Sequence, residues 1–141
     1  MKKKVIALIG IGILLLIGMH AYFQPLSLSN ALTENSRLSM HLIGFGDPDL
    51  DTVEYKVNTA EQPGFLTFIE QYPYRRTLGT LFSNGTITET GNNMLSIYVL
   101  DDQEAVHHIS VTPSGKIVVN GKNYYMQNAE QFIEQIIEMM E

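Results

Sequence analysis

An uninterrupted apolar run near the N-terminus is the strongest constraint on how this chain folds. Residues 5–23, VIALIGIGILLLIGMHAYF, contain no charged side chain. At about 1.5 Å per residue, a helix of this length spans about 28 Å, close to the thickness of a bilayer's hydrocarbon core. Lysines occupy positions 2–4, and Tyr22 and Phe23 close the run. Under the positive-inside rule, this pattern predicts a transmembrane helix with the N-terminus in the cytoplasm and the rest of the chain outside.

The same run also fits a cleaved signal peptide, but the residues after it favour a retained anchor. A signal peptidase needs small residues at positions −3 and −1. Cleavage after Ala21 would place Met19 at −3, and the better match, Ser29-Asn30-Ala31, lies well beyond the run. The tetrad Leu16-Ile17-Gly18-Met19 resembles a bacterial lipobox with Met in place of the lipid-accepting Cys. We therefore expect a signal anchor, with secretion after cleavage as the alternative.

The anchor divides the 141-residue chain into four segments: a basic start at 1–4, the transmembrane helix at 5–23, a polar tether at 24–36 and one domain at 37–141. Residues 24–141 hold six basic and fifteen acidic side chains, a net charge of −9. This excess argues against nucleic acid as a partner. It indicates solubility beside an anionic membrane, with a preference for cationic ligands as the alternative. The lack of cysteine excludes disulfides and thiolate chemistry.

Short strands and two helices are expected within the domain. The strands are 38–45, 52–57, 94–100, 105–112, 116–119 and 122–126, and the short turns between most of them favour antiparallel pairing. Asn84-Gly85 and Asn120-Gly121 each match a type I′ hairpin turn, the first between residues 75–83 and 86–90. A helix over about 60–71, with a capping box begun by Thr59, and a C-terminal helix from Asn128 carry apolar stripes. We expect an α+β fold, a mainly antiparallel hairpin meander with two helices packed on it.

No pattern in the sequence predicts a catalytic residue, a cofactor or a metal site. Nucleophile-elbow, P-loop and zinc-protease motifs are absent. The run Asp47-Pro48-Asp49-Leu50-Asp51 opens like a calcium loop. An EF-hand, however, needs Gly at the sixth position and Glu at the twelfth, where this chain has Thr52 and Asn58. We expect an acidic turn with solvated carboxylates there.

Two adjacent histidines, a residue type that often ligates metals, lie on a predicted strand. Neighbours on a strand point to opposite faces, so His107 and His108 cannot chelate one ion together. His107 alternates with apolar residues, and we expect it to lie half-buried against the core. His108 alternates with Ser110 and Thr112, a pattern that indicates a solvent-facing side.

Two pairs of residues are candidate contacts for a ligand or partner. Arg75 and Arg76 stand beside tyrosines in an otherwise acidic domain. They protect an edge strand by charge, or they contact a carboxylate, a phosphate or a wall polymer. Of Tyr124 and Tyr125, one ring is expected to pack and the other to be exposed, where a tyrosine makes a good contact residue.

The order of these features resembles small extracytoplasmic proteins of Gram-positive bacteria, many of which look like lipoproteins. The resemblance rests on the lysine-rich start, the apolar helix, the strand, helix and hairpins, and the stretch Gly-Lys-Ile-Val-Val-Asn-Gly-Lys-Asn-Tyr-Tyr at 115–125 before a closing helix. It implies a membrane-attached domain outside the cell. It offers no catalytic residues, because the functions of that group are mostly unassigned. This chain differs from the lipid-anchored members of that group, because Met19 stands where their lipid-accepting Cys would be.

Three functional hypotheses follow. The first is a single-pass membrane protein with an extracytoplasmic binding or accessory module for a protein, a peptide or a cell-wall component. The second is an extracytoplasmic, hydrolase-like enzyme whose site is assembled from scattered residues; a histidine beside a carboxylate in a deep pocket would favour it. The third is an immunity or self-protection protein, which differs from the first only in its partner.

Overall fold

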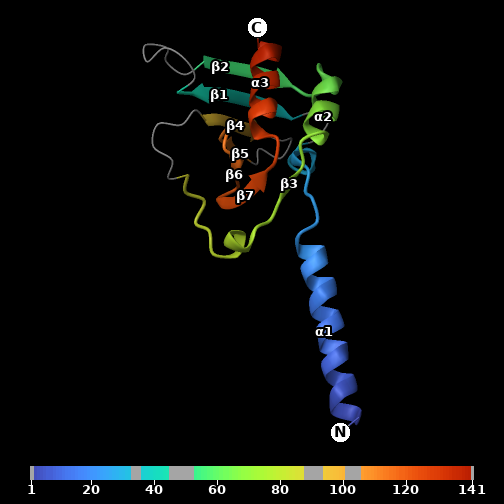
Figure 1. Ribbon diagram of the computed structural model, residues 1–141. Coiled ribbons are helices and arrows are strands. Elements are labelled where there is room, and N and C mark those ends of the chain that lie inside the picture. Colours follow the sequence, from blue (N-terminus) through green and yellow to red (C-terminus); the bar gives the residue numbers. More distant parts are fainter. Residues whose placement is uncertain (1, 33–35, 45–52, 88–93, 101–105, 141) are drawn as a thin grey trace.

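The computed structural model describes residues 2–32, 36–44, 53–87, 94–100 and 106–140 (Figure 1). The acidic run at 47–51 and the turn expected at 101–104 lie outside these ranges. The helices are α1 (Lys2–Tyr22), α2 (Pro63–Glu70) and α3 (Ala129–Met140), with 3₁₀ turns η1 (Leu28–Ala31) and η2 (Leu78–Leu81). The strands are β1 (Arg37–Ile43), β2 (Val53–Asn58), β3 (Tyr74–Arg75), β4 (Met94–Leu100), β5 (Val106–Val111), β6 (Lys116–Val119) and β7 (Lys122–Met126).

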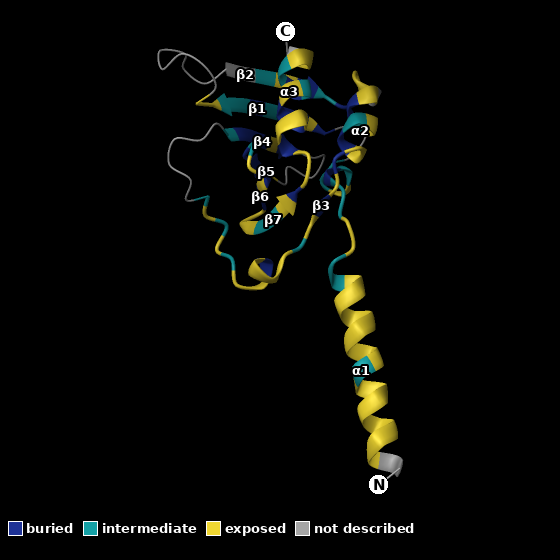
Figure 2. Ribbon diagram, viewed as in Figure 1, coloured by how far each residue is buried: buried dark blue, intermediate teal, exposed yellow. Residues whose placement is uncertain are grey.

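The apolar run at the N-terminus forms the long helix α1, which projects from the rest of the molecule (Figure 1). Its segment Lys4–Tyr22 is long and apolar enough to cross a membrane, as no other helix in the described ranges is. Its side chains are exposed along almost the whole length (Figure 2). An exposed, uniformly apolar helix fits the transmembrane helix of a single-pass protein or a signal anchor, because lipid would cover that surface.

The remaining elements form one seven-stranded sheet in the order β2-β1-β4-β5-β6-β7-β3. Every neighbouring pair is antiparallel. Asn120 and Gly121 join β6 to β7 with φ values of +48° and +76°. These are the left-handed conformations that a type I′ turn requires, and Asn and Gly adopt them at the lowest cost. The predicted α+β class with a hairpin meander is confirmed.

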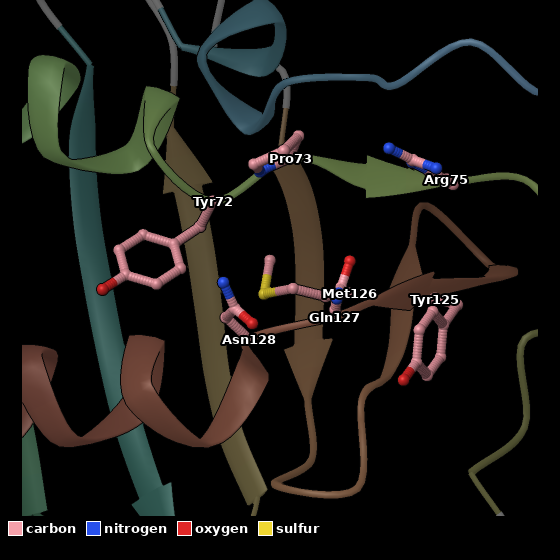
Figure 3. A pocket seen from close by; sticks show the side chains of 7 residues that line it. All are labelled: Tyr72, Pro73, Arg75, Tyr125, Met126, Gln127 and Asn128. Atoms are coloured by element: carbon pink, nitrogen blue, oxygen red, sulfur yellow. The ribbon is translucent and has the colours of Figure 1, made fainter.

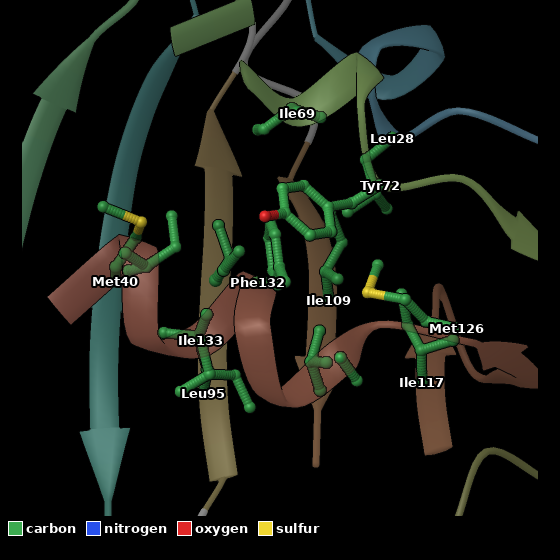
Figure 4. Close-up of a cluster of buried hydrophobic side chains, with 14 of the residues drawn as sticks. Leu28, Met40, Ile69, Tyr72, Leu95, Ile109, Ile117, Met126, Phe132 and Ile133 are labelled. Carbon is green, nitrogen blue, oxygen red and sulfur yellow. The ribbon is translucent and has the colours of Figure 1, made fainter. Parts of the chain in front are cut away.

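The two helices of the domain share one face of the sheet and enclose the core with it (Figure 4). Phe132, Ile133 and Ile136 of α3 are fully buried, as the apolar stripe of the C-terminal helix predicts. Phe68 of α2 stacks on Phe132 with ring centroids 5.7 Å apart. The Tyr72 hydroxyl, just after α2, donates a 2.7 Å hydrogen bond to Gln135 of α3. The helices therefore stabilise each other as well as the sheet.

The predicted capping box at Thr59 is wrong. Helix α2 begins at Pro63, and Gln62 precedes it without a side-chain capping bond. Thr59 is buried, and its hydroxyl donates to the carbonyl of Ser36, the residue before β1. A buried hydroxyl must find a partner, so the bond to the sheet takes precedence over a local cap. Proline suits the first position of α2, where an N–H would have no helical acceptor.

The hairpin predicted at Asn84-Gly85 is also wrong. In residues 76–87 the chain forms η2 and then an irregular segment, 83–87, which lies against the β6–β7 turn. Asn84 Oδ1 accepts bonds from the Thr86 amide and hydroxyl, so these residues do form a turn, but the described residues on either side of it, 76–83 and 86–87, form no strand. The Ser83 hydroxyl accepts a 2.9 Å bond from the Asn123 amide of β7. Tertiary contact with β7 thus replaces the local hairpin.

Candidate functional site

The sheet register brings together two of the four predicted contact residues, Arg75 and Tyr125. They are direct cross-strand partners in the β3–β7 pair. On its other side, β3 is held by Leu26, which exchanges backbone bonds of 2.7 and 2.9 Å with Tyr74. The short strand is therefore fixed along both edges. Its alternation places Tyr74 toward the core and leaves Arg75 exposed.

A small hollow of about 160 Å³ lies where β3, β7 and the start of α3 meet. Figure 3 shows Tyr72 and Asn128 on one side of it and Arg75 and Tyr125 on the other. Within the described ranges, Arg75 makes no hydrogen bond or ion pair, and the Tyr125 side chain is 46% exposed. A free guanidinium beside polar side chains can bind a carboxylate or phosphate through two parallel hydrogen bonds.

The other tyrosine of the pair, Tyr124, packs against the core. Its ring meets Tyr74 edge-on, with the centroids 5.0 Å apart. The two rings thus divide as expected, one packed and one exposed. Burial and the neighbouring Tyr124 raise the pKa of Tyr74, and Arg76 partly offsets that rise. Tyr124 also borders a second hollow, on the core side of the sheet edge, so it does not join Arg75 in one site.

Arg76 contacts the C-terminal end of α1. Its Nη1 donates a 3.2 Å bond to the Tyr22 carbonyl, and its guanidinium carbon lies 5.5 Å from the centre of the Tyr22 ring. The Tyr22 hydroxyl in turn donates to the Thr77 carbonyl at 3.3 Å. The two arginines are therefore not one clamp. Arg76 is engaged within the chain, and Arg75 is available to a partner.

The face of the sheet opposite the helices carries a polar and aromatic cluster that the sequence analysis did not single out. Three rings of this cluster lie in a row across the sheet, with Tyr98 between His41 and His108. His41 meets Tyr98 edge-on at 5.5 Å, and Tyr98 stacks on His108 at 4.7 Å. His41 Nε2 lies 3.0 Å from Ser39 Oγ. Strands β1, β4 and β5 thus contribute neighbouring members to a single row.

His108 is partly buried and contacts two serines. Its Nε2 lies 2.9 Å from Ser96 Oγ and 3.1 Å from Ser110 Oγ. Burial lowers the pKa of His108, which favours the neutral ring. When the ring is neutral with its proton on Nδ1, Nε2 can accept a hydrogen bond from either hydroxyl. The ring thus offers a hydrogen-bond partner to two buried serines.

The prediction that His108 shares a solvent-facing side with Ser110 and Thr112 is wrong. Ser110 and Thr112 are only 4% and 1% exposed. Residues 85–87 line a hollow of about 500 Å³ together with these side chains, so the segment after η2 covers this part of the sheet. Alternation along the strand correctly predicts which residues share a face of the sheet. It does not predict that residues 85–87, from a distant part of the chain, lie over this face.

A serine hydroxyl bonded to a histidine is also the contact of a nucleophile and its base. Ser96, however, is 2% exposed in the centre of β4, so a substrate carbonyl has no path to its oxygen. His107 accepts a 2.9 Å bond from the Asn120 amide. Among the described side chains, no group of three or more metal-ligating residues comes together. The cluster can stabilise the fold, because its side chains provide hydrogen-bond partners for one another beneath residues 85–87.

Compared with protein-family models, with curated proteins and with solved structures, the chain matches none.

The pattern that would have revealed the serine-histidine cluster is visible in the sequence. Ser39 and His41, Ser96 and Tyr98, and His108 and Ser110 are each two residues apart on a strand, so each pair shares a face. Only the register shows that the three pairs lie side by side.

Proposed function

We propose that this chain is a single-pass membrane protein whose outer domain is a binding module, and that Arg75 and Tyr125 contact an acidic group of its partner. The α1 helix, whose first three residues are lysines, anchors the protein with its N-terminus in the cytoplasm. The domain then lies outside the cytoplasm, as in the bacterial extracytoplasmic proteins that the sequence resembles. The observation that carries the proposal is the Arg75 guanidinium, which has no hydrogen-bond or ion-pair partner among the residues that the structure describes, beside an exposed tyrosine at a formed hollow.

The size of the hollow favours a macromolecular partner over a free small molecule. Small-molecule pockets have volumes of about 300–1,000 Å³. The hollow at Arg75 has a volume of about 160 Å³, enough for one side chain or end group. A peptide or protein that places a carboxylate there would gain a charge-assisted bond to Arg75 and a flat contact with Tyr125. The excess of acidic residues elsewhere in the domain would help to orient such a partner by repulsion.

A comparison of two charge-reversed variants tests this proposal. The tagged full-length protein is recovered from detergent-solubilised membranes of its native host, and partners that copurify near stoichiometry are quantified. Arg75→Glu should abolish recovery of the partner, because it replaces attraction by repulsion at the contact. Lys122→Glu is the matched control, since Lys122 is an exposed cation at the other end of β7 and the change in net charge is identical.

Equal recovery with Arg75→Glu and the wild type would refute the assignment of Arg75. Recovery that needs only residues 1–23 would place recognition in the membrane helix. Retention on purified cell wall, without a protein partner, would point to an anionic wall polymer instead. If the partner recovered through Arg75 is a toxic protein, the module is an immunity protein, because that hypothesis differs only in the partner.

A further inference from the structure

The 3₁₀ turn η2 exposes an unusual concentration of apolar surface. The side chains of Leu78, Leu81 and Phe82 are 69%, 60% and 89% exposed. The turn is not loose, because Thr77 and Thr80 bond reciprocally in a capping box and Thr80 is buried. Such a cluster on a fixed turn marks an interaction surface rather than a scattered set of exposed residues.

This surface is continuous with the apolar surface of α1. Leu78 and Leu81 line a hollow of about 370 Å³ together with the second half of α1, including Leu14, Leu15 and Met19. These α1 residues precede Tyr22 by three to eight positions. At about 1.5 Å per residue they lie roughly 5–12 Å before it along the helix axis. If Tyr22 marks the membrane interface, the hollow opens at the depth of the outer acyl chains.

The position of η2 relative to α1 is fixed by polar contacts at the junction. Arg76 Nη1 donates to the Tyr22 carbonyl, and the Tyr22 hydroxyl donates to the Thr77 carbonyl. Both bonds join the end of the helix to the residues directly before η2. Figure 1 shows η2 at the end of the domain from which α1 departs. Insertion of α1 therefore brings η2 to the membrane surface with it.

We propose that Leu78, Leu81 and Phe82 form a second membrane contact, which dips into the same leaflet as the C-terminal end of α1. The occupant of this surface is lipid, because the surface continues that of the membrane helix and opens beside it. Arg76 and Tyr22 lie at the border of this surface that is nearest the domain. At such a position a guanidinium can reach lipid phosphates while the methylene groups of the arginine side chain stay among apolar groups. The contact fixes which side of the domain faces the bilayer.

The charge of the domain gives this contact a distinct signature. Residues 24–141 carry a net charge of −9, so anionic headgroups repel the domain as a whole. An apolar contact does not need anionic lipid, and salt does not weaken it. Vesicles of phosphatidylcholine alone are therefore the appropriate probe. A headgroup-dependent electrostatic contact would fail in them.

Site-specific fluorescence in the reconstituted full-length chain tests the proposal. The chain has no cysteine, so a single introduced cysteine labels uniquely. An environment-sensitive dye at Phe82→Cys should show blue-shifted emission and strong quenching by lipids spin-labelled on the upper acyl chain. The same dye at Glu138→Cys, on an exposed position near the end of α3, is the control and should remain aqueous and unquenched. The quenching at position 82 should persist in high salt.

A second substitution tests the same contact without changing the labelled position. Leu81→Asp in the Phe82→Cys background should reduce the quenching severalfold, while circular dichroism shows that the fold is retained. Aqueous, unquenched emission at position 82 in the unaltered background would overturn the proposal. Blue-shifted emission that lipid quenchers do not affect, or that disappears when the protein is diluted in lipid, would show contact with a second protein chain and would also overturn it.

Discussion

Replacing Gly85 with alanine tests whether the segment after η2 is seated on the β6–β7 turn. Gly85 has a φ of +74°, and a Cβ there would lie 2.6 Å from backbone atoms of Gly121. Gly121 has a φ of +76°, but a Cβ on it meets nothing within 4 Å. Gly64, in the first turn of α2, also has open space and needs no positive φ. Alanine at Gly85 therefore introduces both a close contact and backbone strain, and alanine at Gly121 introduces backbone strain alone. Alanine at Gly64 introduces neither.

The expected losses follow from this geometry. A left-handed backbone costs a residue with a Cβ about 1–2 kcal/mol, which is the whole loss expected for Gly121→Ala. Gly85→Ala also displaces Ser83 and Thr86, which each bond Asn123, at about 1 kcal/mol per bond. We expect a total of about 3–4 kcal/mol for that variant. Gly64→Ala should stabilise the protein by about 0.5–1 kcal/mol, because it removes a glycine from a helix.

Thermal unfolding of the full-length protein in detergent micelles, followed by circular dichroism, measures these differences. Since 1 kcal/mol shifts the Tm of a domain of this size by about 4 °C, Gly85→Ala should lower Tm by about 12–16 °C. Gly121→Ala should lower it by about 4–8 °C, and Gly64→Ala should raise it by about 2–4 °C. A loss for Gly85→Ala no larger than that for Gly121→Ala would refute the close approach of the segment to the turn.

Three other predictions concern the core, the histidine cluster and the topology. Phe132→Ala should lower the free energy of unfolding by about 3–5 kcal/mol, because the side chain is fully buried; a loss under 1 kcal/mol in denaturant titrations would contradict its packing. Burial lowers the pKa of His108 in the folded state, so the unfolded state binds more protons and stability should fall as pH drops below about 6.5. His108→Gln should lose this contribution, and identical Tm changes between pH 7.5 and pH 5 in both proteins would count against it. A cysteine at Glu138 should react with a membrane-impermeant thiol reagent in intact host cells, and protection there would reverse the proposed orientation.

The sequence predicted those elements whose signals are local and strong. The apolar run needs no partner to define α1, and the stripe of α3 reports its buried face directly. Asn120-Gly121 lies between strands that pair with each other, so its turn chemistry and its tertiary surroundings agree. Asn84-Gly85 has the same turn chemistry, but the chain before it is held at η2 and Ser83 bonds β7 instead. A turn signal specifies a reversal of the chain and does not specify strands.

The sequence predicted which residue types form the candidate site, but it did not predict which of these residues lie next to one another. Exposed arginine and tyrosine are visible in the sequence, and the division of each pair between two faces follows from alternation. That Arg75 lies opposite Tyr125, and that Arg76 bonds the end of α1, depends on which strand β3 joins. β3 has two residues, too few to carry a pattern, and its place at the edge is set by β7 and Leu26.

The strand order also determines when each part of the sheet can form. Strands β4 to β7 are neighbours both in the sequence and in the sheet, so this meander needs only short-range contacts and should form quickly. The β1–β2 hairpin is equally local, but its inner edge has no partner until β4 has been synthesised. β3 waits longer still, because it pairs with β7, almost at the end of the chain. Leu26, only four residues after α1, pairs in turn with β3. The growing chain can therefore attach its domain to the segment beside its anchor only after nearly all of the domain has been made.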